Sequence, residues 1–220
     1  MFEVTIKGKR LMFQTSDTMF SPRYIDPGTL AMLSQVDFHN EELILDLGCG
    51  YGVVGILAAK FIDPSRVCMI DTDAEALRLS KENARLNNVD GVHIIQSDGF
   101  KNLDVTGFSL ILCNPPYTVD FAVPKRFIKK GFNRLRVGGR FFMVTKRRLW
   151  YKNKFISVFG GVQIKQVDDY NVFCAIKKTK HYVDGLEKPM RKRSMSKKLT
   201  RRVRASGRHR RYKNKYEKLI

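Results

Sequence analysis

Apolar residues follow two alternating patterns along the chain. Short, mostly apolar runs predict buried strands, and longer stretches with apolar residues every three or four positions predict amphipathic helices. Because the two patterns alternate, we expect an α/β fold: a Rossmann-like, mostly parallel sheet with helices on both faces. The predicted strands are 42–47, 66–71, 92–97, 108–113 and 140–145, and the predicted helices are 28–36, 53–61, 74–88, 124–135 and 147–159.

Strand pairs are predicted at both ends of this alternation. Residues 2–15 predict two short strands around Gly8 and Lys9, and a loop over 16–28 follows them. At the other end, residues 162–169 and 171–178 predict an antiparallel C-terminal hairpin.

Charge divides the chain into a domain and a tail. The 220 residues include 41 Lys and Arg against 21 Asp and Glu, which gives a formal net charge of +20. Residues 188–220 alone hold 15 of these basic residues and one acid, Glu217. We therefore expect a domain over 1–185, of which 1–40 form the N-terminal strands and entry helix, and a basic tail over 186–220.

The excess of positive charge predicts a polyanionic partner, either a nucleic acid or an anionic membrane surface. In the tail, Lys and Arg are interspersed with His209, Tyr212 and Tyr216, so the segment can neutralise phosphates and stack on bases. No apolar face accompanies these charges, as membrane binding requires. The tail therefore favours RNA, with a solvated flexible segment as the alternative.

Other sequence features indicate a cytoplasmic protein. No stretch reaches the roughly 18 apolar residues of a membrane span, and the first residues do not form a signal peptide. The four cysteines stand singly within apolar segments, which favours reduced core residues over a metal site.

A glycine-rich loop follows the predicted strand 42–47. In DLGCGYGVVG, Gly48, Gly50 and Gly52 stand between a strand and a helix, where the backbone can approach a ligand closely beside a helix N-terminus. The spacing also fits a dinucleotide-binding fingerprint. Asp46, directly before the glycines, would repel a pyrophosphate but could hold the ammonium group of an amino acid.

Two more acids end the next two predicted strands. Asp71 could accept hydrogen bonds from both hydroxyls of a ribose, and Asp98 could accept one from the exocyclic amine of adenine. A capping or solvated role is the alternative for each acid alone. Because ligands bind beyond the carboxyl ends of parallel strands, we expect these acids and the glycine loop to line one site.

A stiff polar corner, NPPY, ends the predicted strand 108–113. Pro115 and Pro116 stop the strand because neither offers a backbone N–H group. The Asn114 Oδ1 atom and the Pro115 carbonyl could accept the two protons of a planar amine, and Tyr117 could stack on the ring that carries it. A simple strand-ending turn is the alternative. The corner therefore predicts a clamp for a planar amine.

Together, DLGCGYG, IDTD, SD and NPPY resemble the motifs of the seven-stranded class I S-adenosylmethionine-dependent methyltransferases. The segment 13–33 further resembles the RsmC-like (MTS family) guanine-N2 methyltransferases of ribosomal RNA, although these carry Phe and His where this chain has Tyr117 and Thr118. The resemblance implies a seven-stranded sheet, S-adenosylmethionine as cofactor and catalytic roles for Asn114, Pro115, Pro116 and Tyr117. The cofactor-binding residues that it implies are Phe20, Ser21, Asp46, Gly48, Cys49, Gly50, Gly52, Asp71, Thr72, Asp98, Gly99 and Asn114.

The predicted function is transfer of a methyl group from S-adenosylmethionine to an exocyclic amine of RNA, with guanine N2 of small-subunit ribosomal RNA as the favoured acceptor. Three alternatives remain open: an adenine-N6 RNA methyltransferase, a protein glutamine-N5 methyltransferase, and an inactive RNA-binding or ribosome-assembly protein. The basic tail argues against a protein substrate. The intact acids and Asn114 argue against an inactive scaffold.

Overall fold

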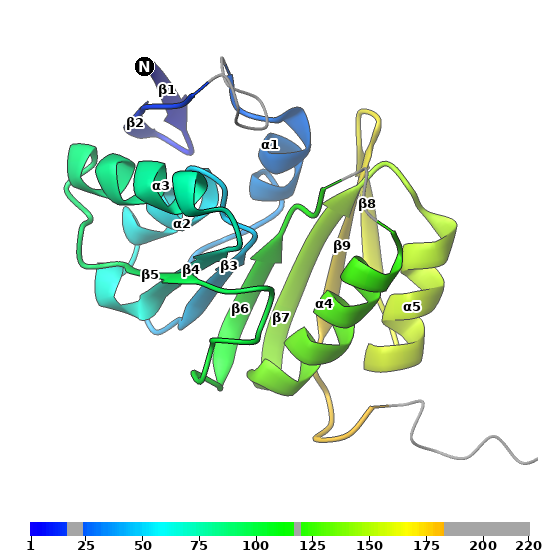
Figure 1. The fold of residues 1–220 in the computed structure, drawn as a ribbon. Coiled ribbons are helices and arrows are strands. Elements are labelled where there is room, and N and C mark those ends of the chain that lie inside the picture. Colours follow the sequence, from blue (N-terminus) through cyan, green and yellow to red (C-terminus); the bar gives the residue numbers. More distant parts are fainter. Residues whose placement is uncertain (17–23, 117–119, 183–220) are drawn as a thin grey trace, which may run out of the picture. The chain divides into compact units, whose positions relative to one another are not determined.

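Seven strands form the main sheet in the computed structural model, which describes residues 1–16, 24–116 and 120–182 (Figure 1). The strand order is β5-β4-β3-β6-β7-β9-β8. Pairings from β5 to β7 are parallel, and those of β9 with β7 and β8 are antiparallel. The strands are β3 (Ile44–Leu47), β4 (Val67–Asp71), β5 (His93–Gln96), β6 (Phe108–Cys113), β7 (Leu135–Thr145), β8 (Gln163–Val167) and β9 (Tyr170–Ile176). This confirms the predicted seven-stranded, mostly parallel sheet with its antiparallel hairpin.

Helices cover both faces of the sheet, as predicted (Figure 1). Alternate strand residues point to opposite faces: Ile44 packs in the core beneath α1, α2 and α3, whereas Leu45 packs in the core beneath α4 and α5. The helices are α1 (Pro27–Leu33), α2 (Val53–Ala59), α3 (Ala74–Leu86), α4 (Ala122–Arg134) and α5 (Leu149–Phe159), with a 3-10 turn at Pro64–Arg66.

A separate two-stranded sheet is formed by β1 (Phe2–Ile6) and β2 (Lys9–Phe13), as the alternation at the start of the chain predicts. Its turn consists of Lys7 and Gly8, both with positive φ, the geometry that two-residue hairpins favour.

No helix of the described residues is long and apolar enough to cross a membrane.

Two strands differ from expectation. β7 begins at Leu135, five residues before the predicted start, because Leu135 pairs with Phe108 of β6 and the pairing resumes at Arg140 after a register shift. Gly138 and Gly139, in between, exchange hydrogen bonds with Lys177. β5 is only partly buried, since it lies at the edge of the sheet and pairs with β4 alone. Neither difference alters the sheet's central crossover point, where successive connections turn to opposite sides between β3 and β6. The predicted tail over 186–220 lies outside the described residues.

Candidate active site

A cavity of about 400 Å³ lies at the carboxyl ends of β3, β4 and β6, beside the crossover point. This is the place where parallel α/β sheets bind ligands, and the volume suits a small-molecule cofactor. The cavity brings together eleven of the residues singled out in the sequence: Asp46, Gly48, Cys49, Gly50, Asp71, Thr72, Asp98, Gly99, Asn114, Pro115 and Pro116.

The remaining candidates are not placed in the cavity. Gly52 has a positive φ of 102° and caps α2, and a Cβ atom there would lie 2.8 Å from Ile56 Cδ1 and 2.9 Å from Met69 Cε. The need for glycine at this position therefore comes from the turn and its packing. Phe20, Ser21 and Tyr117 lie outside the described residues, and their roles stay predictions.

Asp46 is a buried carboxylate at the end of β3, with 3% of its surface exposed. Its Oδ2 atom accepts a hydrogen bond of 2.8 Å from the Gly55 N–H group in the first turn of α2. The pKa of the Asp46 carboxyl is raised to about 7, mainly by burial and also by the nearby Asp71 charge. The hydrogen bond from Gly55 acts in the opposite direction and lowers this pKa. A bound cation would offset this unfavourable burial of negative charge.

Asp71 connects the glycine loop to the end of β4. Its Oδ2 atom accepts from the Gly50 N–H group at 2.9 Å, and Oδ1 accepts from the Thr72 and Asp73 N–H groups at 2.7 and 3.1 Å. These bonds fill three of the roughly four acceptor positions of a carboxylate. The carboxylate is thus held rigidly, with acceptor capacity remaining on Oδ2.

Asp98 is engaged by two cations. It forms ion pairs with Lys101 at 2.7 Å and with Arg126 of α4 at 2.5 Å. The Lys101 hydrogen bond, followed by that from Arg126, holds the pKa of the Asp98 carboxyl below its usual range. Arg126 also lines the cavity, so the carboxylate expected to face adenine shares its acceptor positions with this guanidinium.

Asn114 directs its amide nitrogen toward the start of α1. Nδ2 donates to Asp26 Oδ1 at 2.7 Å and to Thr29 Oγ1 at 2.9 Å. Asp26, 8% exposed, caps α1 by accepting from the Thr29 N–H group at 2.9 Å. Because a carboxylate only accepts, the amide orientation is set: nitrogen toward α1, and Oδ1 on the other side.

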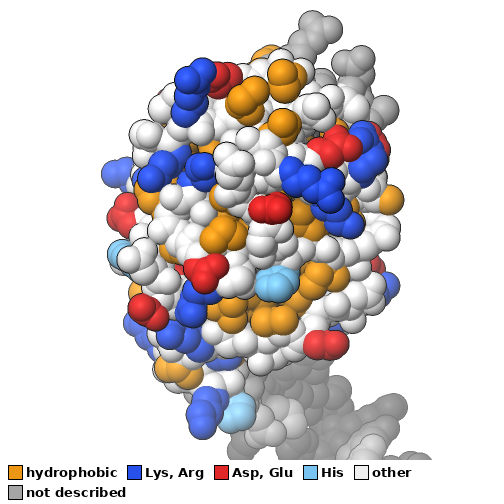
Figure 2. All heavy atoms as spheres, turned by 90° about the vertical axis from the view of Figure 1, so that its left-hand side faces the viewer, with side chains coloured by type: hydrophobic (Ala, Val, Ile, Leu, Met, Phe, Trp, Pro, Cys, Tyr) orange, Lys and Arg blue, Asp and Glu red, His pale blue; other side chains and the backbone are white. Residues whose placement is uncertain are grey.

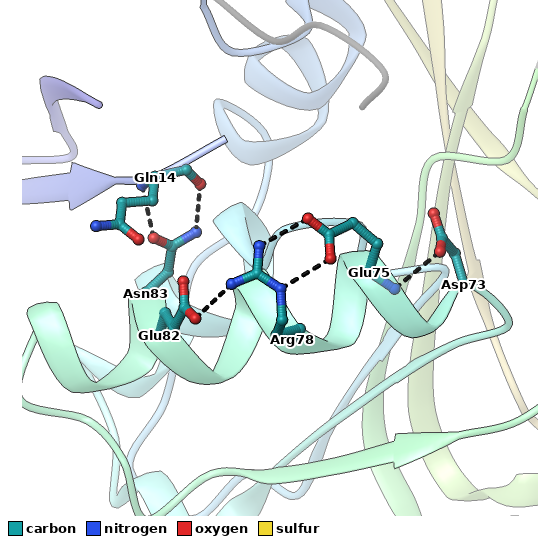
Figure 3. Close-up of polar contacts among 6 residues, drawn as sticks. All are labelled: Gln14, Asp73, Glu75, Arg78, Glu82 and Asn83. Atoms are coloured by element: carbon teal, nitrogen blue, oxygen red, sulfur yellow. Dashed lines mark hydrogen bonds and ion pairs between the residues drawn. The ribbon is translucent and has the colours of Figure 1, made fainter. Parts of the chain in front are cut away.

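The chain on each side of residues 17–23 is anchored next to the site. Asn83 of α3 exchanges two hydrogen bonds with the Gln14 backbone (Figure 3), and its Nδ2 atom also donates to the carbonyl of Tyr51 in the glycine loop. The same helix is capped by Asp73 and carries Arg78 between Glu75 and Glu82 (Figure 3). Beyond the gap, Ile25 and Asp26 line the cavity.

Several lining residues were not singled out from the sequence. The walls include Thr29, Tyr51, Val53, Val54, Val123 and Phe127. Phe127 of α4 packs on Gly99, where a Cβ atom would lie 2.9 Å from its ring. Nothing in the local sequence relates Gly99 to a helix residue 28 positions later. By contrast, Val53 and Val54 directly follow the glycine loop, so their place in the cavity wall could have been inferred from the sequence.

A model of the methyltransferase small domain matches residues 10–174, and the chain belongs to this family. Among its relatives, the uncharacterized protein YbxB of Bacillus subtilis is 32% identical over 65% of this chain and 72% of its own length. The ribosomal RNA small subunit methyltransferase C of Pseudomonas putida is 30% identical over 79% of this chain and 53% of its own length.

A solved structure is similar over most of the fold. The T. thermophilus 16S rRNA N2 methyltransferase RsmC, in complex with AdoMet and guanosine, matches 80% of this chain with 27% identity and a TM-score of 0.73. This chain covers 50% of that chain. The protein thus spans about half the length of these two methyltransferases.

Proposed function

We propose that this protein transfers a methyl group from S-adenosylmethionine to an exocyclic amine of RNA, with guanine N2 of small-subunit ribosomal RNA as the acceptor. The observation that carries the proposal is the Asn114 amide, held by Asp26 and Thr29 at the rim of a cavity that Asp46, Asp71 and Asp98 also line. The similarity to an RsmC that binds AdoMet and guanosine supports both the cofactor and the acceptor.

The cavity fits S-adenosylmethionine on three counts. Burial raises the pKa of the Asp46 carboxyl, and the ammonium group of the methionine part would stabilise its ionised form. The remaining acceptor capacity of Asp71 Oδ2 suits a ribose hydroxyl, and the second hydroxyl would share Oδ1 with a backbone N–H group. Asp98 would accept the adenine amine beside Arg126. When bound, the cofactor supplies an electrophilic methyl group on a positively charged sulfur.

The residues of the chain position the acceptor. The lone pair of an exocyclic amine on guanine is delocalised into the ring, so the amine must be held in a reactive orientation. Asn114 Oδ1 and the Pro115 carbonyl accept its two protons, and the adjacent prolines keep the carbonyl fixed. Neither group is a strong base, so the proton leaves after the methyl group is transferred.

The same clamp suits adenine N6 and a glutamine amide, because both are planar amines. The net charge of +20 and the ribosomal RNA methyltransferases among the relatives favour RNA over protein. RNA binding through the tail over 186–220, and a cytoplasmic location, belong to this proposal as well.

The experiment is methyl transfer from labelled S-adenosylmethionine to separated RNA and protein from cells that lack the gene. Label in the RNA fraction supports the proposal. Label confined to protein would favour the glutamine alternative. No transfer, together with no cofactor binding by calorimetry, would favour an inactive RNA-binding scaffold.

A further inference from the structure

Charge is unevenly distributed within the domain itself, apart from the tail. Residues 1–120 contain ten Lys and Arg against sixteen Asp and Glu. Residues 121–167 contain thirteen Lys and Arg and no acid. The second half of the domain therefore carries a positive surplus that neither the cavity nor the tail explains.

Much of this surplus lies on two neighbouring helices. α4 and α5 pack against each other on one face of the sheet, and both N-termini lie at the edge formed by the carboxyl ends of the parallel strands (Figure 1). The exposed or half-exposed cations on α4 are Lys125, Arg126, Lys129, Lys130 and Arg134. Lys146, Arg147 and Arg148 directly precede α5, and Lys152 lies in its first turn, all four exposed. By contrast, the edge formed by β5 and α3 mixes Lys and Arg with Asp and Glu (Figure 2).

A groove with an aromatic wall runs between these helices. Its lining residues are Phe121, Ala122, Lys125, Arg126, Lys129 and Trp150. The rings of Phe121 and Trp150 are stacked, with centroids 4.5 Å apart and an interplanar angle of 30°. The Arg147 guanidinium lies 4.9 Å from the centre of the Phe121 ring. Both rings are half-buried, so part of each ring surface is exposed to solvent next to the Lys125 and Lys129 side chains.

The groove and the cavity share a wall. Arg126 lines both, while Val123 and Phe127 face the cavity and Lys125 and Lys129 face the groove. The first turns of α4 thus separate the two spaces, shortly after the Asn114-Pro115-Pro116 corner in the chain. The groove therefore lies next to the cavity in which Asn114 would hold the proposed target base.

Resting on the proposed function, we propose that the Phe121–Trp150 groove binds the single RNA strand next to the target nucleotide. A neighbouring base stacks on the aromatic pair, and Lys125, Lys129 and Arg147 hold the adjacent phosphates. Base-on-aromatic stacking within a positive groove is the usual way in which proteins bind single strands. Within the described residues, Lys125, Lys129 and Lys130 form no ion pair with an acid, which leaves their charge available to phosphate.

Trp150 provides a direct test because it is the only tryptophan of the chain. Single-stranded RNA of about ten nucleotides is added to the full-length protein while tryptophan emission is recorded, and binding is followed in parallel by the anisotropy of labelled RNA. We expect quenching that saturates with binding. Inorganic polyphosphate, which has charge but no bases, should bind without this quenching. RNA binding with unchanged tryptophan emission would overturn the groove as a base platform.

The phosphate contacts are tested by charge removal on α4. Lys125→Ala with Lys129→Ala should lower the slope of log affinity against log salt by about 1.4, at roughly 0.7 per phosphate contact of a single strand. The matched control, Lys81→Ala with Arg85→Ala, removes two exposed charges from α3 and should leave the slope nearly unchanged. Equal effects of the two double variants would contradict the proposal.

Measuring methyl transfer to the same RNA separates the two claims. Normal transfer with no quenching of Trp150 would reject the groove and leave the proposed function standing. Absence of both RNA binding and transfer would reject the proposed function together with the groove.

Discussion

Asn114 and Asp26, 88 positions apart in the chain, form a hydrogen bond of 2.7 Å that fixes the orientation of the Asn114 amide. The bond connects the corner after β6 to the first residue before α1. Asp26 therefore has two roles. Its Oδ1 atom caps α1, and the same atom fixes the orientation of the Asn114 amide, which is proposed to hold the acceptor amine. It is a positioning residue for the proposed reaction.

The first prediction concerns Asp26→Ala. Without the carboxylate, the Asn114 amide loses the partner that fixes its orientation, and small misplacements at a reacting centre cost up to about 100-fold in rate. We expect transfer to fall roughly tenfold to 100-fold, cofactor affinity to stay near normal, and loss of the cap to cost about 1 kcal/mol of stability. Single-turnover transfer and calorimetry of cofactor binding measure the two effects separately.

The conservative variant Asp26→Asn is the control for this prediction. An Asn side chain caps helices about as well as Asp, and its Oδ1 atom can still accept from Asn114. It should restore stability and much of the rate. A normal rate in Asp26→Ala would show that the Asn114 orientation does not depend on this contact.

The second prediction concerns the stability of the fold against pH. The folded pKa of Asp46 is about 7, well above the ordinary value of 3.8, so the folded state keeps this proton when the unfolded state has lost it. The contribution to stability is complete below about pH 4 and is lost as the pH rises through 7. Asp46→Asn cannot ionise, and its thermal unfolding temperature should exceed that of the wild type increasingly from pH 5 to pH 8.

Cofactor binding should change in the opposite direction. Asp46→Asn removes the charge that is proposed to hold the ammonium group, so its affinity for S-adenosylmethionine should fall at pH 8, where the wild-type carboxylate is ionised. A stability difference that does not vary with pH would contradict the buried, protonated Asp46. Unchanged affinity would remove Asp46 from the cofactor site.

A third prediction is that Asp71→Asn weakens cofactor binding. An amide offers a single oxygen, so it cannot accept from Gly50, Thr72 and Asp73 and also from a ribose hydroxyl. Hydrogen bonds to charged groups contribute about 1.5–3 kcal/mol, which predicts a loss of roughly 10-fold to 150-fold in affinity by calorimetry. Wild-type affinity in this variant would place the ribose elsewhere.

The fourth prediction concerns the basic tail. A chain ending at residue 187 loses fifteen Lys and Arg and a single Glu. RNA affinity should fall at low salt, and the slope of log affinity against log salt should decrease by several units, since each phosphate contact adds roughly 0.7. The thermal unfolding temperature should change little. An unchanged slope would show that the tail does not contact RNA.

The fold was largely predictable because its strands and helices have distinct periods. Runs such as FSLILC (108–113) were predicted as strands, and β6 has those bounds. The start of β7 was missed because Leu135 pairs with Phe108 ahead of a register shift, and Gly138 and Gly139 then exchange hydrogen bonds with Lys177, far along the chain. Such tertiary pairing has no signal in the local sequence.

The candidate site was predictable where its residues follow strand ends. Asp46, Asp71 and Asn114 reach one cavity because parallel strands bring their carboxyl ends together. Contacts made by helices from elsewhere in the chain were not predictable. Arg126 reaches Asp98 across 28 positions, and Thr29 reaches Asn114 across 85.

The most direct test of the account is nucleoside mass spectrometry of RNA methylated by the wild type and by Asn114→Ala. The account predicts N2-methylguanosine in small-subunit ribosomal RNA with the wild type. It predicts none with Asn114→Ala, although that variant still binds S-adenosylmethionine. N6-methyladenosine as the product would contradict the acceptor, and an equal yield from Asn114→Ala would contradict the clamp itself.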